Sequence, residues 1–117
     1  MIHTLTLFDA SGDNTAQVLY AGAGKVFYIH AINRNTADAY LQFFDLAAAD
    51  VTVGTTTPKL SFLVPGGNGT TAGAFEAHFD AAPLEFELRV TYACTTTATG
   101  GTNPTTALTL NFSYRTG

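Results

Sequence analysis

A strict alternation of apolar and polar side chains limits the fold of this sequence more than any other feature. In residues 84–92 every even position is apolar, and every odd position is charged or a threonine. Residues 108–115 alternate in the same way. Because successive side chains of a β-strand point to opposite faces, each segment predicts a strand with one face on a core. In the first segment we expect Phe86, Leu88 and Val90, together with Tyr92, to face that core.

The rest of the chain also predicts strands, because β-branched and aromatic residues fill its periodic stretches and helix signals are nearly absent. Clusters of glycine, proline and asparagine separate these stretches, which is typical of turns. We expect about eight strands, near residues 3–8, 17–21, 25–33, 39–45, 59–64, 74–80, 84–93 and 106–115. The sequence therefore predicts an all-β, single-domain antiparallel β-sandwich over residues 1–117, jelly-roll-like, with an immunoglobulin-like sandwich as the alternative.

Residues 26–32 and 40–44 depart from simple alternation, because apolar side chains occupy both faces of each expected strand. A strand of this kind is covered on both sides. The second face predicts cover either by another chain or by the protein's own loops. On the first interpretation, the residues of an oligomer interface are Phe27, Ile29, Leu41 and Phe43, and Phe43→Asp is expected to turn an oligomer into a monomer.

Few charges are present: 12% of the residues are charged, against about 25% in typical domains. A surface of this kind loses little hydration when it is covered, which favours burial against other subunits; a neutral secreted domain is the alternative. The net charge of −4 and the five scattered Lys and Arg residues argue against nucleic-acid binding. No apolar run reaches the ~18 residues of a membrane helix, and the N-terminal residues do not resemble a signal peptide, so we expect synthesis in a cytoplasm.

Metal binding is not expected from the histidines. His3, His30 and His78 lack the spacing of metal ligands. We expect His30 to be structural, His78 to face solvent and His3 to be loosely held. Residues 9–15 carry oxygen side chains at alternate positions, like the start of a calcium loop, but the expected glycine and the closing glutamate are missing.

Catalysis is not expected either. Cys94 is the single cysteine, so no internal disulfide is possible, and no serine lies in a nucleophile motif. Glu76, Glu85 and Glu87 are expected to form a solvated or interfacial acidic face rather than a pair of catalytic carboxylates. The sequence thus predicts a protein that is not an enzyme, with no catalytic residue, metal or cofactor.

Four segments carry a resemblance to a known group of proteins: YLQFFD at residues 40–45, VTVGTTTP at 51–58, LVPGG at 63–67 and ACTTTATG at 93–100. In this order they resemble small β-sandwich virion structural proteins of tailed bacteriophages. The resemblance covers roughly residues 25–115. The matching segments are signatures of strands and turns, not of a catalytic site.

The resemblance implies a head decoration (cement) protein, which binds the major capsid protein on the capsid exterior and forms a homo-oligomer, with a trimer favoured. Residues 1–8 are expected to contact the shell as an arm. The candidate interface residues in the loops are Thr55, Thr56, Thr57, Asn68, Thr96 and Thr97. One alternative is a tail, baseplate or fibre protein. Another is a carbohydrate-binding β-sandwich, which the lack of tryptophan and the use of Phe and Tyr in the core pattern disfavour.

Overall fold

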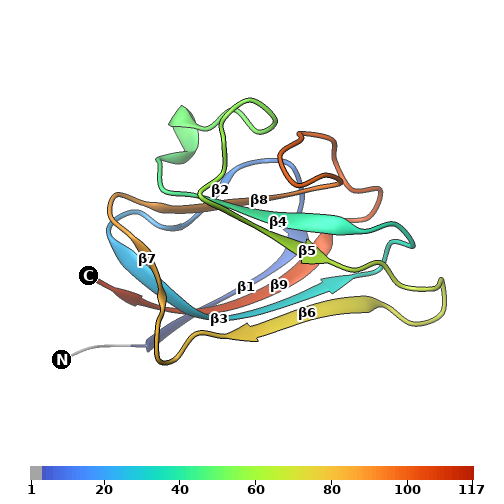
Figure 1. The fold of residues 1–117 in the computed structure, drawn as a ribbon, viewed down its shortest axis with the longest axis horizontal. Coiled ribbons are helices and arrows are strands. Elements are labelled where there is room, and N and C mark those ends of the chain that lie inside the picture. The colour runs from blue at the N-terminus through green and yellow to red at the C-terminus, as the bar shows by residue number, and fades with distance from the viewer. Residues whose placement is uncertain (1–3) are drawn as a thin grey trace.

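The structure, a computed structural model, folds the chain into two antiparallel β-sheets that face each other (Figure 1). It describes residues 4–117, so His3 and the first residues of the expected arm lie outside the described residues. The elements are β1 (Thr4–Gly12), β2 (Gln17–Tyr20), β3 (Gly24–Asn33), β4 (Ala39–Phe44), η1 (Ala48–Asp50), β5 (Leu60–Val64), β6 (Gly73–His78), β7 (Leu84–Phe86), β8 (Val90–Thr95) and β9 (Leu108–Thr116). In this part of the chain no helix is long and apolar enough to cross a membrane.

The strand order is that of a jelly roll. One sheet, called sheet A here, has the order β1-β9-β3-β6, and β7 pairs with β3 beside β6. The other, sheet B, has the order β2-β8-β4-β5. Consecutive strands β1 and β2 lie in different sheets, whereas the first two strands of an immunoglobulin-like sandwich share one. The predicted jelly-roll-like sandwich is therefore confirmed, with nine strands among residues 4–117 in place of about eight.

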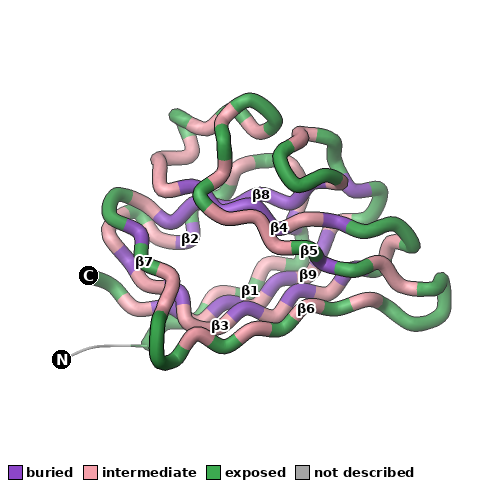
Figure 2. The backbone as a smooth tube through the Cα atoms, in the orientation of Figure 1, coloured by how far each residue is buried: buried purple, intermediate pink, exposed green. Residues whose placement is uncertain are grey.

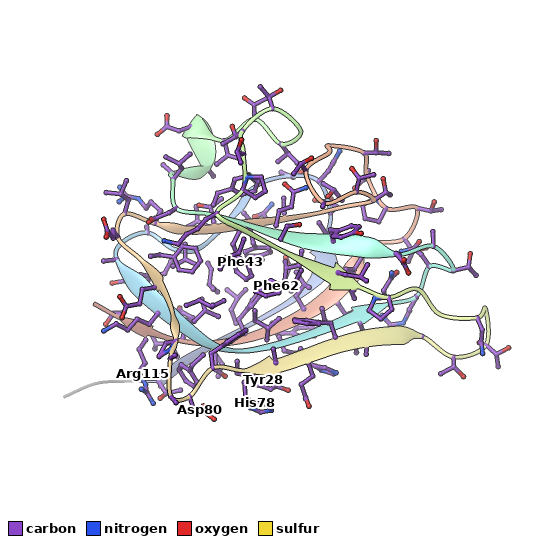
Figure 3. The ribbon with its side chains drawn as sticks, in the orientation of Figure 1. Tyr28, Phe43, Phe62, His78, Asp80 and Arg115 are labelled. Carbon is purple, nitrogen blue, oxygen red and sulfur yellow. The ribbon has the colours of Figure 1, made fainter. Side chains whose placement is uncertain are left out.

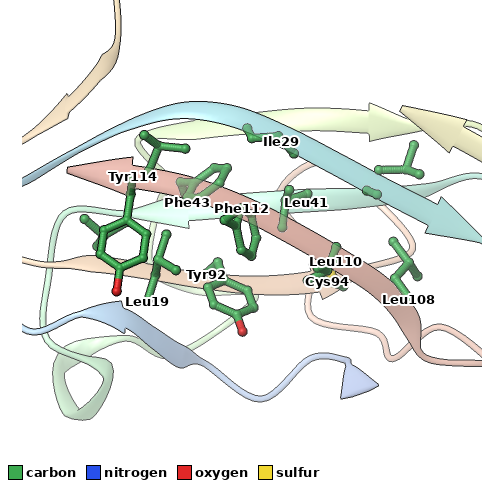
Figure 4. Packing of buried hydrophobic residues seen from close by; sticks show 14 of the residues in the cluster. Leu19, Ile29, Leu41, Phe43, Tyr92, Cys94, Leu108, Leu110, Phe112 and Tyr114 are labelled. Carbon is green, nitrogen blue, oxygen red and sulfur yellow. The ribbon is translucent and has the colours of Figure 1, made fainter. Parts of the chain in front are cut away.

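The core fills the space between the sheets and is centred on aromatic rings (Figure 4). The ring of Phe43 lies 5.7 Å from that of Phe86, 5.8 Å from that of Phe112 and 6.0 Å from that of Phe62, measured between centroids. Offset and edge-on rings at this spacing attract each other beyond the burial of their area. Buried residues follow the inner faces of the strands, while the loops are mostly exposed (Figure 2).

The predicted second apolar face is wrong for three of its four residues. Ile29, Leu41 and Phe43 are completely buried in the core between the sheets. In β4 the opposite face carries Gln42 and Phe44, and both are buried as well. Since every residue from Leu41 to Phe44 is covered, the apolar pattern alone did not show which side of the strand was the core.

The strand predicted at residues 84–93 is two strands in different sheets. β7 belongs to sheet A and β8 to sheet B, and residues 87–89 cross between them. The carboxylate of Asp45 accepts hydrogen bonds from all three backbone N–H groups of this crossing, at 2.8–3.1 Å. Leu88 is 57% exposed there, so its predicted place in the core is wrong, whereas Phe86 and Val90 are buried as expected.

Candidate interaction surface

Two loops lie together over the outer face of sheet B (Figure 1). One follows β4 and contains residues 51–58; the other follows β8 and contains residues 95–103. Their backbones touch: a Cβ atom on Gly101 would lie 2.7 Å from the carbonyl oxygen of Val53. Gly54 has a φ of +94°, a conformation that favours glycine, and a Cβ there would lie 3.0 Å from the nitrogen of Gly101. We call residues 51–58 and 95–103 the loop layer.

Gln42 anchors the second loop from below. Its side chain leaves the outer face of β4 and is completely buried. The amide nitrogen Nε2 donates to Thr95 Oγ1 at 2.7 Å, and to the carbonyl oxygens of Gly100 at 3.0 Å and Thr97 at 3.3 Å. Ser61 of β5 donates to a further carbonyl of the same loop at 2.7 Å. A loop rich in threonine and glycine is thereby fixed on the sheet.

The first loop is closed by its own threonines. The N–H of Thr52 donates to Thr56 Oγ1 at 2.9 Å. In return, the backbone N–H groups of Thr55 and Thr56 donate to the carbonyl oxygen of Thr52 at 2.9 and 2.8 Å. Such a hydrogen-bonded turn, packed on the second loop, is a firm surface feature rather than a freely moving segment.

The structure brings five of the six predicted loop residues into this one layer. Thr55, Thr57 and Thr97 are exposed, while Thr56 and Thr96 are half-buried. The hydroxyl oxygen of Thr56 already accepts the N–H of Thr52, so Thr56 is less suited to contact a partner than its neighbours.

Asn68 and Phe27 lie outside the loop layer. Asn68 is exposed between β5 and β6, where its side-chain Oδ1 accepts hydrogen bonds from the backbone N–H groups of Thr70 and Thr71. Phe27, in β3 of sheet A, is half-buried under the guanidinium of Arg115, whose Cζ lies 4.6 Å from the ring centroid. The predicted interface residues therefore fall into four places: the core, the loop layer, the loop of Asn68 and the site of Phe27.

The loop layer lacks formal charge. Residues 51–58 and 90–114 contain no Asp, Glu, Lys or Arg. Threonine hydroxyls and backbone groups can hydrogen-bond a partner, and they lose less hydration free energy on burial than charged groups do. Protein interfaces are likewise depleted in charged residues at their centres. The layer thus has the chemistry of a surface that another protein can cover.

Two buried groups that could be reactive are held in their neutral forms. Burial raises the pKa of the Cys94 thiol, and the carboxylates of Asp9 and Asp13 raise it further. Burial also raises the pKa of Tyr92, whose hydroxyl donates to Asp9 at 2.6 Å. A thiol reacts as its thiolate, so Cys94 in this setting is inert.

The acidic residues of the expected calcium-like segment serve the turn itself. Asp9 Oδ1 accepts the N–H of Ser11 at 2.8 Å, and Asp13 Oδ1 accepts the N–H of Thr15 at 3.0 Å. Among residues 4–117 no group of three or more His, Cys, Asp or Glu side chains is placed to hold a metal ion. That the chain is not an enzyme stays a prediction.

The predicted acidic residues and histidines lie mainly on the surface. Glu76, Glu85 and Glu87 are exposed. His78 is exposed near Glu76, as expected for a solvent-facing histidine, and its Nε2 lies 3.9 Å from Glu76 Oε1. His30 is half-buried on the outer face of sheet A.

Comparison with known protein families and with curated proteins adds no relative. No model of a known protein family matches the chain, and no curated protein is significantly similar to it. Of the four segments quoted from the sequence, two lie in the loop layer. Residues 40–45 form β4 and the start of the next loop, while 51–58 and 93–100 contribute most of the loop layer.

Replacing the anchor of the layer gives a direct prediction. Gln42→Met keeps the size of the side chain but removes the donor for Thr95, Thr97 and Gly100. We expect unfolding to become easier by about 1–3 kcal/mol, because the Thr95 hydroxyl oxygen and the Gly100 carbonyl lose their donor, while the Thr97 carbonyl keeps the Thr95 hydroxyl. Hydrogen exchange should rise in residues 96–102 far more than in β9. Leu63→Met, an exposed change on the same face of sheet B, is the control and should leave both unchanged.

Proposed function

We propose that the chain is a virion structural protein of a tailed bacteriophage, and that it serves as a head decoration protein which binds the major capsid protein through the loop layer. The observation that carries this proposal is the layer itself: two loops fixed on one sheet, without charge, and rich in exposed hydroxyls. Two of the four segments on which the resemblance to phage structural proteins rests, 51–58 and 93–100, make up most of it.

The physical case rests on preorganisation. Binding normally orders loops and side chains, and the entropy lost in that step opposes association. In this chain Gln42 and Ser61 already hold the second loop, and Thr52 and Thr56 close the first. A partner that covers the layer therefore gains its contacts without ordering it.

A decoration protein acts on the shell by mass action. A protein that binds the expanded shell more tightly than other states shifts the equilibrium toward the expanded shell, in proportion to its concentration and affinity. A rigid β-sandwich is suited to link neighbouring capsomers in this way. On this proposal the chain is made in the host cytoplasm, assembles on the capsid exterior and forms a trimer at local threefold positions.

A tail, baseplate or fibre position is the alternative within the virion. The same loop layer could bind a tail subunit, since its chemistry is not specific to a shell. Copy number separates the two positions, because a decoration protein is present in hundreds of copies and a tail component in far fewer. Quantitative mass spectrometry of purified virions measures it.

The binding experiment uses one change inside the layer and one outside it. Thr55→Glu puts a charge on an exposed position of the loop layer, and Thr70→Glu puts the same charge on the exposed loop between β5 and β6. The heads come from the phage that encodes the chain; they are expanded and lack this protein. Each purified variant is mixed with these heads. We expect Thr55→Glu to weaken binding about tenfold or more, the effect of ~1.4 kcal/mol, and Thr70→Glu to leave it unchanged. Equal binding by both variants, or no binding of the unmodified protein, would contradict the proposal.

A further inference from the structure

The outer face of sheet A, on the other side of the sandwich from the loop layer, carries an ordered array of polar and aromatic side chains. The pairing register places residues of four strands in two adjacent rows across β1, β9, β3 and β6. The first row is Thr6, Ser113, Tyr28 and His78; the second is Phe8, Asn111, His30 and Glu76. We call these eight residues the sheet A platform. At ~4.8 Å between strands it is about 14 Å wide.

Aromatic rings border the platform. Phe8 is 67% exposed, which is unusual for a side chain of this size and polarity. The rings of Tyr28 and His78 lie 4.8 Å apart, and the hydroxyl of Tyr28 donates to Glu76 at 2.8 Å, which fixes the phenol. Figure 3 shows Tyr28 and His78 on the outside of sheet A, away from Phe43 and Phe62 between the sheets.

The middle of the platform is a shallow depression. Thr6, Phe8, Tyr28, Asn111 and Ser113 line it, together with backbone neighbours in β1 and β9. The β9 side chains that line it, Asn111 and Ser113, are short, and Phe8 and Tyr28 lie on the neighbouring strands β1 and β3. A planar or ring-shaped ligand could lie between the two rings.

The hydrogen-bonding groups of the platform are available: Asn111 and Ser113 line the depression, and His30 lies beside Asn111 in the pairing register. Within residues 4–117 the side chains of His30, Asn111 and Ser113 form no hydrogen bond with another residue. An imidazole, a carboxamide and a hydroxyl offer donors and acceptors side by side. Exposed rings with a few convergent polar groups are features of small-molecule sites, in which the polar groups set orientation.

The charge of the platform limits the chemical class of the ligand further. It contains no lysine or arginine, its carboxylate is Glu76, and the whole chain has a net charge of −4. An anionic ligand would be repelled, and a hydrocarbon would leave the central polar groups without partners. A neutral sugar suits both kinds of group. Its C–H faces can pack on Phe8 and Tyr28, and its hydroxyls can hydrogen-bond with Asn111, Ser113 and His30.

From this geometry we infer that the sheet A platform binds a neutral oligosaccharide, with a sugar ring against Phe8 and its hydroxyls on Asn111 and Ser113. The absence of tryptophan made such a site unexpected from the sequence, because most Phe and Tyr residues fit the core pattern. In the structure Phe8 is exposed and Tyr28 is half-buried on the outer face of sheet A, so neither ring belongs to the core. The inference does not depend on the proposed function, since the loop layer lies on the opposite sheet.

The test is titration with a panel of neutral hexasaccharides: maltohexaose, cellohexaose, laminarihexaose, xylohexaose and chitohexaose. Amide NMR signals report the site. We expect at least one sugar to shift the signals of Thr6, Phe8, Asn111 and Ser113, and not those of the loop layer. Phe8→Ala is expected to weaken that binding about tenfold. Leu63→Ala, which removes an exposed apolar side chain from the outer face of sheet B, is the matched control and should bind normally.

Three results would overturn the inference. One is a panel in which no sugar shifts the platform signals. Another is equal affinity of the unmodified protein and Phe8→Ala. The third is a concentration-dependent shift of the same signals in the protein alone, with a matching rise in mass, because a second copy would then be the occupant of the platform. Failure of the shell-binding experiment, in contrast, would leave this inference unaffected.

Discussion

Phe43→Ala is expected to lower the free energy of unfolding by about 3–5 kcal/mol, the range for removing a buried aromatic side chain. Phe43 is completely buried and its ring meets those of Phe62, Phe86 and Phe112, which come from both sheets. Deleting it leaves a cavity at the place where the two sheets are joined. Urea unfolding followed by tyrosine fluorescence or circular dichroism measures the change.

Phe8→Ala is the matched control, because it removes the same side chain from the surface. Phe8 is 67% exposed, so we expect a change within about 0.5 kcal/mol. A loss at Phe43→Ala no larger than that at Phe8→Ala would contradict the described core. The result also bears on the oligomer test expected from the sequence. Phe43→Asp buries a charge in the core, so we now expect unfolding rather than dissociation of an intact oligomer.

Periodicity predicted the class of the fold because each strand of a sandwich has one face on the core and one face outside, so apolar and polar residues alternate along it. Residues 108–115 form β9 with the apolar side chains Leu108, Leu110, Phe112 and Tyr114 buried, as expected. The number and spacing of short strands also favoured a sandwich, although they left the jelly-roll and the immunoglobulin-like order open. These features are local, so a single sequence contains them.

The sequence could not show where the chain changes sheets. Alternation runs without a break through residues 84–92, yet the crossing at 87–89 leaves Leu88 exposed. The signal that decides the crossing is Asp45, which lies about forty residues earlier and binds the three N–H groups. A contact of that range has no counterpart in the local pattern.

The candidate surfaces show the same limit. The threonine-rich loops were expected at an interface, and five of their residues lie together in the loop layer. Nothing in the sequence pairs these loops, because the contact of Gly54 with Gly101 and the role of Gln42 arise only when sheet B has formed. The sheet A platform was missed for a related reason: its rows come from four strands that are neighbours only in space.

Asp45→Ala is expected to destabilise the protein by about 2–4 kcal/mol at neutral pH, because three backbone donors lose a charged acceptor. The carboxylate accepts the N–H groups of Glu87, Leu88 and Arg89, and it lies 3.7 Å from the ammonium of Lys59. Among residues 4–117 these three N–H groups have no other hydrogen-bond acceptor. Urea unfolding of the variant at pH 7 measures the loss.

The pH dependence of that loss tests the carboxylate specifically. Burial raises the pKa of Asp45, but the three N–H groups and Lys59 outweigh it, and the net pKa lies below its ordinary value of 3.8. Since the unfolded chain binds the proton more readily, the stabilising contribution is complete above the ordinary pKa and is lost as the pH falls through the lowered one. The difference in unfolding free energy between the unmodified protein and Asp45→Ala should therefore shrink in strongly acidic buffer.

Asp50→Ala is the matched control for this experiment. Asp50 is exposed at the end of η1, and its side chain takes part in no hydrogen bond with residues 4–117, so its removal should change stability little at either pH. A destabilisation by Asp45→Ala that is equal at pH 7 and in strong acid would assign the effect to lost packing. In that case the negative charge would not hold the crossing, and the chain would change sheets for another reason.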